Sequence, residues 1–324
     1  MTGWAIVLAV VGAGCYALGA RWQNRAVQNT HADPSRATLE DGHRRSGRAR
    51  ILPLLRDRGW LGGLGMLGAG TVLHVTALSL APLTVVQPVG VLALPLAALL
   101  DAHARQARLS RRAVAAIVAC TIGVVGFVAR AATITTQQLG TRAELTQIVT
   151  LLVAVAVGLA ILSAASRTAS RRMSVAPRMR GVALRPVRSL GQISAAASCF
   201  GFVAVLTKLV VAHFVAGDLA AVAPLAVPAM VAALLWGGWW AQQAHAGAPT
   251  EVVVAGLTVI DPLVAVGVGA AVLGEAAGAA PSAMLALLAC GALAAAGVIA
   301  LARHHTATPT SPATRPAVRR QVRT

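Results

Sequence analysis

Aromatic side chains are scarce in this chain of 324 residues, and only 3% of its residues are aromatic. A pocket for drug-like rings or a platform for stacked bases needs several of them, so neither is favoured. The sequence also lacks a glycine-rich phosphate loop, a pair of carboxylates near the middle of an apolar run and a nucleophile–base pattern. We therefore expect no enzyme activity and no nucleotide-driven step.

Acidic residues and cysteines are few as well. There are 10 Asp and Glu against 28 Lys and Arg, for a formal net charge of +18, but no aromatic residues alternate with the basic runs, so nucleic acid is not an expected partner. The cysteines all lie inside apolar runs and none has CxxC spacing, which excludes a disulfide framework and predicts no cofactor. They are Cys15, Cys120, Cys199 and Cys290.

Long apolar runs dominate what remains. Hydrophobic residues make up 57% of the chain and charged ones 12%, with a mean hydropathy of +0.72. Runs of about 18 or more uncharged residues are long enough to cross a bilayer as helix. We predict an all-α polytopic membrane protein with nine transmembrane helices. They cover residues 3–21, 59–80, 83–101, 113–130, 147–165, 190–211, 219–241, 252–274 and 281–302.

Arginine is concentrated in alternate connections between these helices. The connections at 27–58, 102–112 and 166–189 and the tail at 303–324 are Arg-rich, whereas the opposite side has little beyond Arg130 and Arg142. Cytoplasmic loops carry the excess of basic residues, so we expect the N-terminus outside and the C-terminus in the cytoplasm of a cell whose plasma membrane holds this multi-pass protein.

One apolar segment is written twice. Residues 83–102 and 257–276 match in register from Leu-Thr-Val through a proline to an acidic residue followed by alanine. Gln87-Pro88 in the first copy corresponds to Asp261-Pro262 in the second, and Asp101 corresponds to Glu275. A duplicated membrane segment is typical of a transporter built from two halves.

Shorter matches extend the repeat. The surroundings of Cys15 resemble those of Cys199, which places Asn24 opposite Lys208, and Ala119-Cys120 resembles Ala289-Cys290. The halves begin five helices apart, an odd number, so they have inverted topology in a 4+1+4 arrangement. The expected units are a first repeat at 1–130 with its cytoplasmic loop at 27–58, a fifth helix and linker at 131–189, a second repeat at 190–302, and a disordered basic tail at 303–324.

This pattern resembles the drug/metabolite transporter superfamily, including the EamA-type permeases and the NIPA-like magnesium transporters. The resemblance rests on Leu257-Thr258-Val259-Ile260-Asp261-Pro262 with Leu273-Gly274-Glu275, and on the first-half version from Ala81 to Pro88. It implies a membrane permease, and nine helices match the NIPA-like branch. The first half differs at the end of the segment, where it has Leu100-Asp101 in place of Gly-Glu.

Few polar side chains lie at membrane depth, where they are costly and usually face a cavity. Asp261 is the deepest carboxylate. It is either a proton or cation site, or the cap of a helix that is kinked or broken at Pro262. Gln87 precedes the other predicted kink, Pro88, and Thr84 and Thr258 share the faces of Gln87 and Asp261 by helical spacing.

Three further residues are candidates for the pathway. Lys208, the only lysine, ends a seam of small residues that includes Ser198; it either snorkels to the interface or attracts anions or couples protons in the outer vestibule. His74 makes either an interhelical hydrogen bond or a proton relay. Glu275 and Asp101 are expected at water-accessible helix ends.

We therefore predict a secondary transporter that moves a small solute or ion by alternating access, with possible coupling through Asp261. A NIPA-like magnesium permease, with Asp261 as the metal-binding residue, is the nearest alternative. A non-transporting membrane scaffold or regulatory subunit is another. The expected partners are the lipid bilayer, the transported solute or ion and, in a homodimer, a second copy.

Overall fold

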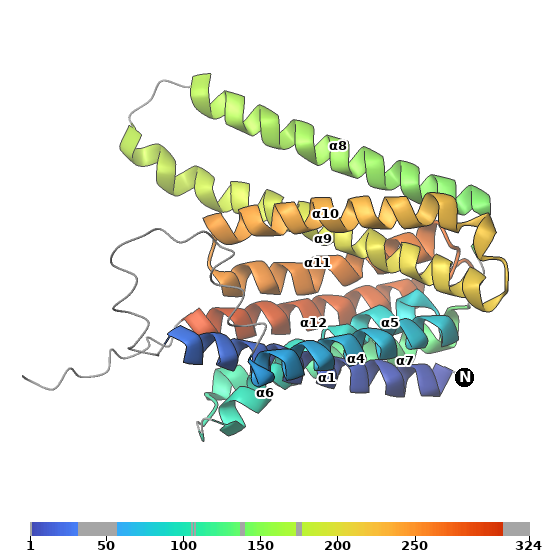
Figure 1. Ribbon diagram of the computed structural model, residues 1–324, viewed down its shortest axis with the longest axis horizontal. Helices are drawn as coiled ribbons and strands as arrows, with labels where there is room; N and C mark the ends of the chain where they lie inside the picture. The colour runs from blue at the N-terminus through green and yellow to red at the C-terminus, as the bar shows by residue number, and fades with distance from the viewer. Residues whose placement is uncertain are drawn as a thin grey trace, which may run out of the picture.

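In the computed structural model, which describes residues 2–31, 57–104, 106, 108–136, 140–172 and 177–306, the described chain is helical and contains no strand (Figure 1). Nine segments within these ranges are long and apolar enough to cross a membrane, which confirms the predicted spans. The elements are α1 (Thr2–His31), α4 (Arg58–Leu80), α5 (Leu83–Gly90), α6 (Ala93–Ala104), α7 (Arg111–Ile134), α8 (Arg142–Arg172), α9 (Pro177–Val215), the 3-10 helix η1 (Leu219–Ala221), α10 (Ala223–Gly247), α11 (Thr250–Ala271) and α12 (Pro281–Thr306).

Several helices continue beyond their apolar parts. Most of the predicted linker at 166–189 is helical, because α8 runs to Arg172 and α9 begins at Pro177. Arginine has a good helix propensity, whereas hydropathy marks only the part of a helix that lies in hydrocarbon. Of the predicted loop at 27–58 and tail at 303–324, residues 32–56 and 307–324 lie outside the described part of the chain.

Polar side chains fix several helix starts. Asp57 accepts a hydrogen bond from the Trp60 N–H at 2.8 Å before α4, and Ser110 accepts one from the Ala113 N–H at 3.1 Å before α7. At α8 the Thr141 N–H donates to Glu144, and the Glu144 N–H donates to the Thr141 hydroxyl. This reciprocal capping box satisfies two N–H groups that have no partner within the helix.

The two prolines of the duplicated segment behave differently. The third predicted span breaks into α5 and α6 at residues 91–92, three residues after Pro88, where the Val91 N–H donates to the Pro88 carbonyl. In contrast, α11 runs without a break through Pro262. The alternative that the helix is broken at Pro262 and capped by Asp261 is therefore wrong, because α11 continues through the proline and packs along α9.

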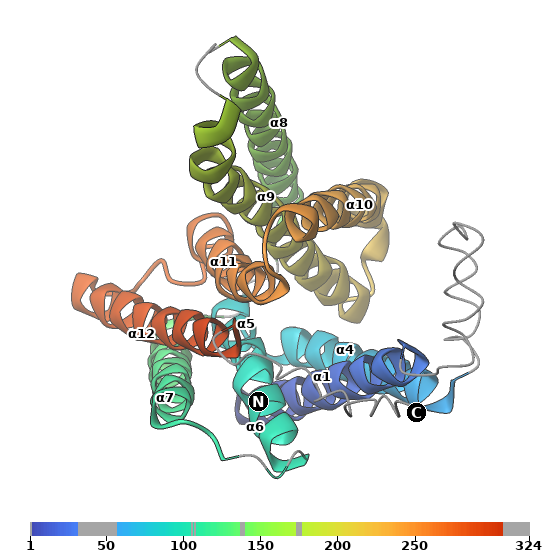
Figure 2. The same cartoon turned by 90° about the vertical axis from the view of Figure 1, so that its left-hand side faces the viewer.

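Packing follows the repeat. In the first half α1 packs on α4 and α5 on α7; in the second half α9 packs on α10 and α11 on α12, so each pair has its counterpart. The halves meet where α7 packs on α12 and α5 on α11 (Figure 2). The fifth span, α8, has no counterpart; it lies at the edge of the bundle against α9 and α10 (Figure 1).

The α7–α12 contact brings two backbones together through glycine. A Cβ on Gly123 of α7 would lie 2.7 Å from the carbonyl oxygen of Cys290. A Cβ on Gly297 of α12 would lie 2.7 Å from the carbonyl oxygen of Ala116. Small residues permit such close approach between helices in a membrane. The contact is therefore reciprocal, as expected for two equivalent helices that meet at the centre of a repeat.

Candidate functional site

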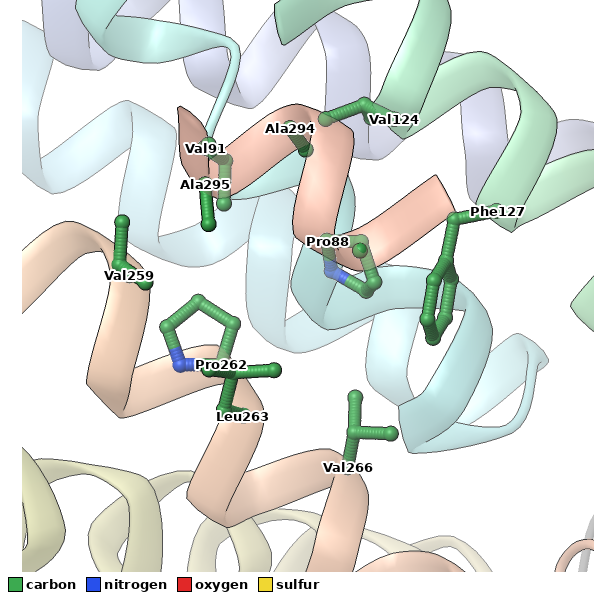
Figure 3. A pocket seen from close by; sticks show the side chains of 11 residues that line it. Pro88, Val91, Val124, Phe127, Val259, Pro262, Leu263, Val266, Ala294 and Ala295 are labelled. Atoms are coloured by element: carbon green, nitrogen blue, oxygen red, sulfur yellow. The ribbon is translucent and has the colours of Figure 1, made fainter. Parts of the chain in front are cut away.

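A cavity lies where the halves meet, between α5, α7, α11 and α12, and the two prolines of the repeat line it together (Figure 3). Phe127 and Val266 also project toward it (Figure 3). All its lining residues are apolar, and its volume is about 50 Å³. The Pro88 and Pro262 segments of the two copies therefore meet at one cavity, although neither Gln87 nor Asp261 is among its lining residues. A cavity of this size holds a few water molecules rather than a drug-sized molecule.

Each proline follows a polar residue with an unsatisfied buried atom. Within the described chain, three buried side-chain atoms have no hydrogen-bond partner: Arg21 Nε, Gln87 Nε2 and Asp261 Oδ1. Two of these three belong to the pseudo-equivalent residues of the repeat. An unsatisfied buried polar group costs about 1–3 kcal/mol, so native proteins retain few of them. One amide nitrogen on α5 and one carboxylate oxygen on α11 are therefore left without a hydrogen-bond partner in the described chain.

The position of Asp261 is set by contact with α9. A Cβ on Gly201 would lie 2.8 Å from the Asp261 carbonyl oxygen and 2.8 Å from the Val264 Cβ, so only glycine permits this approach. Asp261 lies inside α11 and does not cap a helix start. Its carboxylate is therefore held at membrane depth by a rigid helix.

A second polar cluster joins Lys208 and Glu275, which is 1% exposed, in a buried ion pair. The Lys208 ammonium also donates to the Ala81 carbonyl at 3.5 Å. Two interpretations made from sequence are thus wrong: Lys208, 2% exposed, does not snorkel to the interface, and Glu275 is not at a solvated helix end. Each charge is buried because the other compensates it.

Glu275 also caps α5, which has Pro82 and no capping side chain at its own start. Its carboxylate accepts from the Leu83 N–H at 2.8 Å, the Thr84 N–H at 2.9 Å and the Thr84 hydroxyl at 2.6 Å. A carboxylate at a helix N-terminus meets unsatisfied N–H groups and the positive end of the helix dipole. Thr84 therefore belongs to this cluster rather than to the Gln87 site. In the sequence, the acidic residue that ends each copy of the duplicated segment is the feature that pointed to a role for Glu275.

The other candidates stay apart from both clusters. The Thr258 hydroxyl donates to the Val254 carbonyl of its own helix at 2.8 Å. Near His74 the interhelical hydrogen bond is made instead by Thr71, whose hydroxyl accepts from the Tyr16 hydroxyl at 3.2 Å. Ser198 is half-buried on α9. All four cysteines are free, as the sequence predicted.

The described residues contain no group of three or more His, Cys, Asp or Glu side chains that could hold a metal ion. Asp261 is thus a single carboxylate with the Gln87 amide on the packed helix α5.

Comparison with known families gives one match: the model of the family "Magnesium transporter NIPA" matches residues 35–174, somewhat less than half of the chain. No curated protein and no solved structure matches. The matched segment includes α4 to α7 and all of α8. With nine candidate spans in the described chain, the match confirms the resemblance to the NIPA-like branch of the drug/metabolite transporter superfamily and supports a membrane transporter.

Proposed function

We propose that this chain is a secondary transporter of the plasma membrane that moves a cation, with Mg²⁺ as the first candidate, and that Asp261 is the carboxylate that receives it. The family match suggests the cation class. The observation that carries the role of Asp261 is its buried Oδ1, which has no hydrogen-bond partner in the described chain. An ionisable residue at membrane depth is costly and usually marks an ion pathway.

The chemistry of Mg²⁺ fits one carboxylate and one amide. Mg²⁺ loses water reluctantly and is commonly bound through one or two carboxylates with several waters retained. An ion that crosses with part of its shell therefore needs few protein ligands. Asp261 supplies the charge, and the Gln87 amide interacts with the retained water. The apolar cavity between Pro88 and Pro262 excludes competing protein ligands.

Alternating access provides the pathway. The cavity beside the site is lined by α5, α7, α11 and α12, two elements from each half. Transporters with inverted repeats expose a central site to one side at a time when one half rocks against the other. The cavity in the present conformation is lined by Pro88 and Pro262 but not by Asp261, so the proposal requires the halves to separate for an ion to reach this carboxylate.

A second candidate is a permease for a small, weakly polar solute. The wholly apolar lining of the cavity favours it, because such a surface gives a bare ion no ligands. Asp261 would then carry the coupling proton, and Gln87 would orient the solute. The two candidates differ in whether a magnesium gradient alone drives flux.

The test is Mg²⁺ flux into proteoliposomes that contain a magnesium-sensitive dye, measured for the wild-type chain and for Asp261→Asn. We expect the wild type to move Mg²⁺ down its gradient and Asp261→Asn to lose most of that flux, since the amide keeps the shape but removes the charge. Asp218→Asn, which makes the same change at an exposed turn after α9, is the matched control.

Unchanged Mg²⁺ flux in Asp261→Asn would overturn the role of Asp261. A wild-type protein that moves no Mg²⁺, yet accumulates metabolites when a pH gradient is imposed, would replace the cation function with the solute function.

A further inference from the structure

The cluster around Lys208 and Glu275 joins the two halves of the repeat. Lys208 lies on α9, and Glu275 follows α11, so both belong to the second half. Their remaining partners, Ala81, Leu83 and Thr84, lie at the start of α5 in the first half. Any motion that separates the halves at this end must break the hydrogen bonds from α5.

Local geometry aims Glu275 at α5. Gly274 has a φ of +65°, which lets the chain turn back after α11, and the Glu275 N–H then donates to the Gly269 carbonyl at 3.2 Å. A Cβ on Gly269 would lie 3.2 Å from both Glu275 Oε2 and Leu83 Cδ2. The turn thus holds the carboxylate against the first residue of α5.

Thr136 and Gly140, which lie between α7 and α8, contact residues of the cluster and its neighbours. The Thr136 N–H donates to the Glu275 carbonyl at 3.0 Å, and a Cβ on Gly140 would meet Leu209, the neighbour of Lys208, and Leu273. The ion pair is therefore enclosed by described residues from both halves. A buried charge pair of this kind is strongly destabilised when one partner is removed, because the other is left uncompensated.

The repeat has no second copy of this cluster. The positions opposite Lys208 and Glu275 are Asn24 and Asp101, so the lysine is not repeated in the first half. In an inverted repeat these positions lie at the opposite end of the bundle. The Lys208–Glu275 pair is therefore a feature of one end of the bundle.

We propose that Lys208, Glu275 and the first turn of α5 form a latch that holds this end of the pathway shut, and that the latch breaks whenever the pathway opens there. The latch rests on the transporter function proposed above. Glu275 accepts hydrogen bonds from α5 across the interface between the halves. Lys208 neutralises the charge of Glu275, so that the carboxylate can remain buried. When α5 moves away, Glu275 loses three donors and keeps Lys208.

The test uses a reporter cysteine beneath the latch. Val205, which is fully buried on α9 one turn before Lys208, is replaced by Cys in a chain whose only native cysteine is Cys120, in the α7–α12 contact. A membrane-impermeant maleimide is then applied from each side of proteoliposomes. The intact latch should give slow labelling of the reporter, and no labelling of Cys120.

Glu275→Gln and Lys208→Gln should each label the reporter roughly tenfold faster or more, because each leaves one buried charge unpaired. Lys208→Arg, which keeps the charge, should remain slow. Asp218→Asn is the matched control, since this carboxylate is exposed at the turn after α9 and makes no capping hydrogen bond. Exchanging the charges, Lys208→Glu with Glu275→Lys, should not restore slow labelling, because a lysine cannot cap α5.

Labelling of the reporter that stays slow in both glutamine variants would overturn the latch, as would full rescue by the charge exchange. A variant that also labels Cys120 has lost its fold. In that case Thr84→Val decides, since it removes one hydroxyl and keeps both charges: faster labelling supports the latch and unchanged labelling refutes it. The assay contains no substrate, so a failure of Mg²⁺ transport leaves its result intact.

Discussion

Gly201 of α9 and Asp261 of α11 touch through their backbones at the level of the candidate site. A Cβ on Gly201 would come within 2.8 Å of the Asp261 carbonyl oxygen, closer than real Cβ atoms approach. The absence of a side chain at Gly201 therefore lets α11 approach α9 closely, and this sets the position of the Asp261 carboxylate. This contact lies inside the second half, so it persists when the halves move relative to each other.

Gly201→Ala should displace α11 and lower both stability and transport. Overpacking a close contact costs about 1–3 kcal/mol, which would appear as a lower melting temperature of the purified protein. Gly267→Ala on α11, the other helix of the contact, is the control, because a Cβ there meets nothing within 4 Å. It should raise stability by up to about 1 kcal/mol through helix propensity. Equal melting temperatures for the two variants would contradict the tight contact.

Gly123→Val and Gly297→Val should each separate α7 from α12 and lower the melting temperature. Both substitutions force apart the same two backbones, so the double variant should lose less than the sum of the single losses. Thermal unfolding of the three variants in detergent measures this coupling. Strictly additive losses would mean that the two glycines act on separate contacts.

Gln87→Leu should leave stability unchanged or raise it by about 1–2 kcal/mol, because it removes a buried amide whose Nε2 has no partner. Transport should fall in the same variant if that amide meets the transported species. Melting temperature and flux are measured on one preparation. A loss of stability would show that the amide is satisfied in the folded protein by water.

The Arg-rich connections should lie in the cytoplasm, with the N-terminus outside. A reporter that is active only in the cytoplasm should therefore give signal when fused after Thr306 and none when fused before Thr2. Fusions at residue 218, between α9 and α10, should behave like the N-terminal fusion. Signal from the N-terminal fusion would invert the assignment and place the Lys208–Glu275 latch on the cytoplasmic side.

Hydropathy and the repeat were enough to predict the nine spans and their arrangement in two equivalent halves. Both follow from patterns local to the chain: a helix needs a fixed apolar length to cross a bilayer, and equivalent segments pack equivalently. The break at residues 91–92 and the continuous helix at Pro262 did not follow, because a proline alone does not decide whether neighbouring helices hold the chain together.

The roles of Lys208 and Glu275 could not be predicted for a related reason. A lone lysine near a helix end is interpreted as an interfacial anchor unless its partner is known. The partner of Lys208 is Glu275, which lies 67 residues away in the sequence. Thr84 lies 191 residues from Glu275. Sequence spacing identifies side chains that share one helix face, but it does not identify which helix ends meet across the bundle.

The first turn of α5 is capped by Glu275, which belongs to the opposite half. The hydrogen bonding at the start of this helix therefore depends on whether the two halves are in contact. While the halves are together, two backbone N–H groups are satisfied by Glu275; when they part, those groups must find water or another acceptor at once. The protection of the Leu83 and Thr84 amides against hydrogen exchange should therefore rise and fall with the transport cycle.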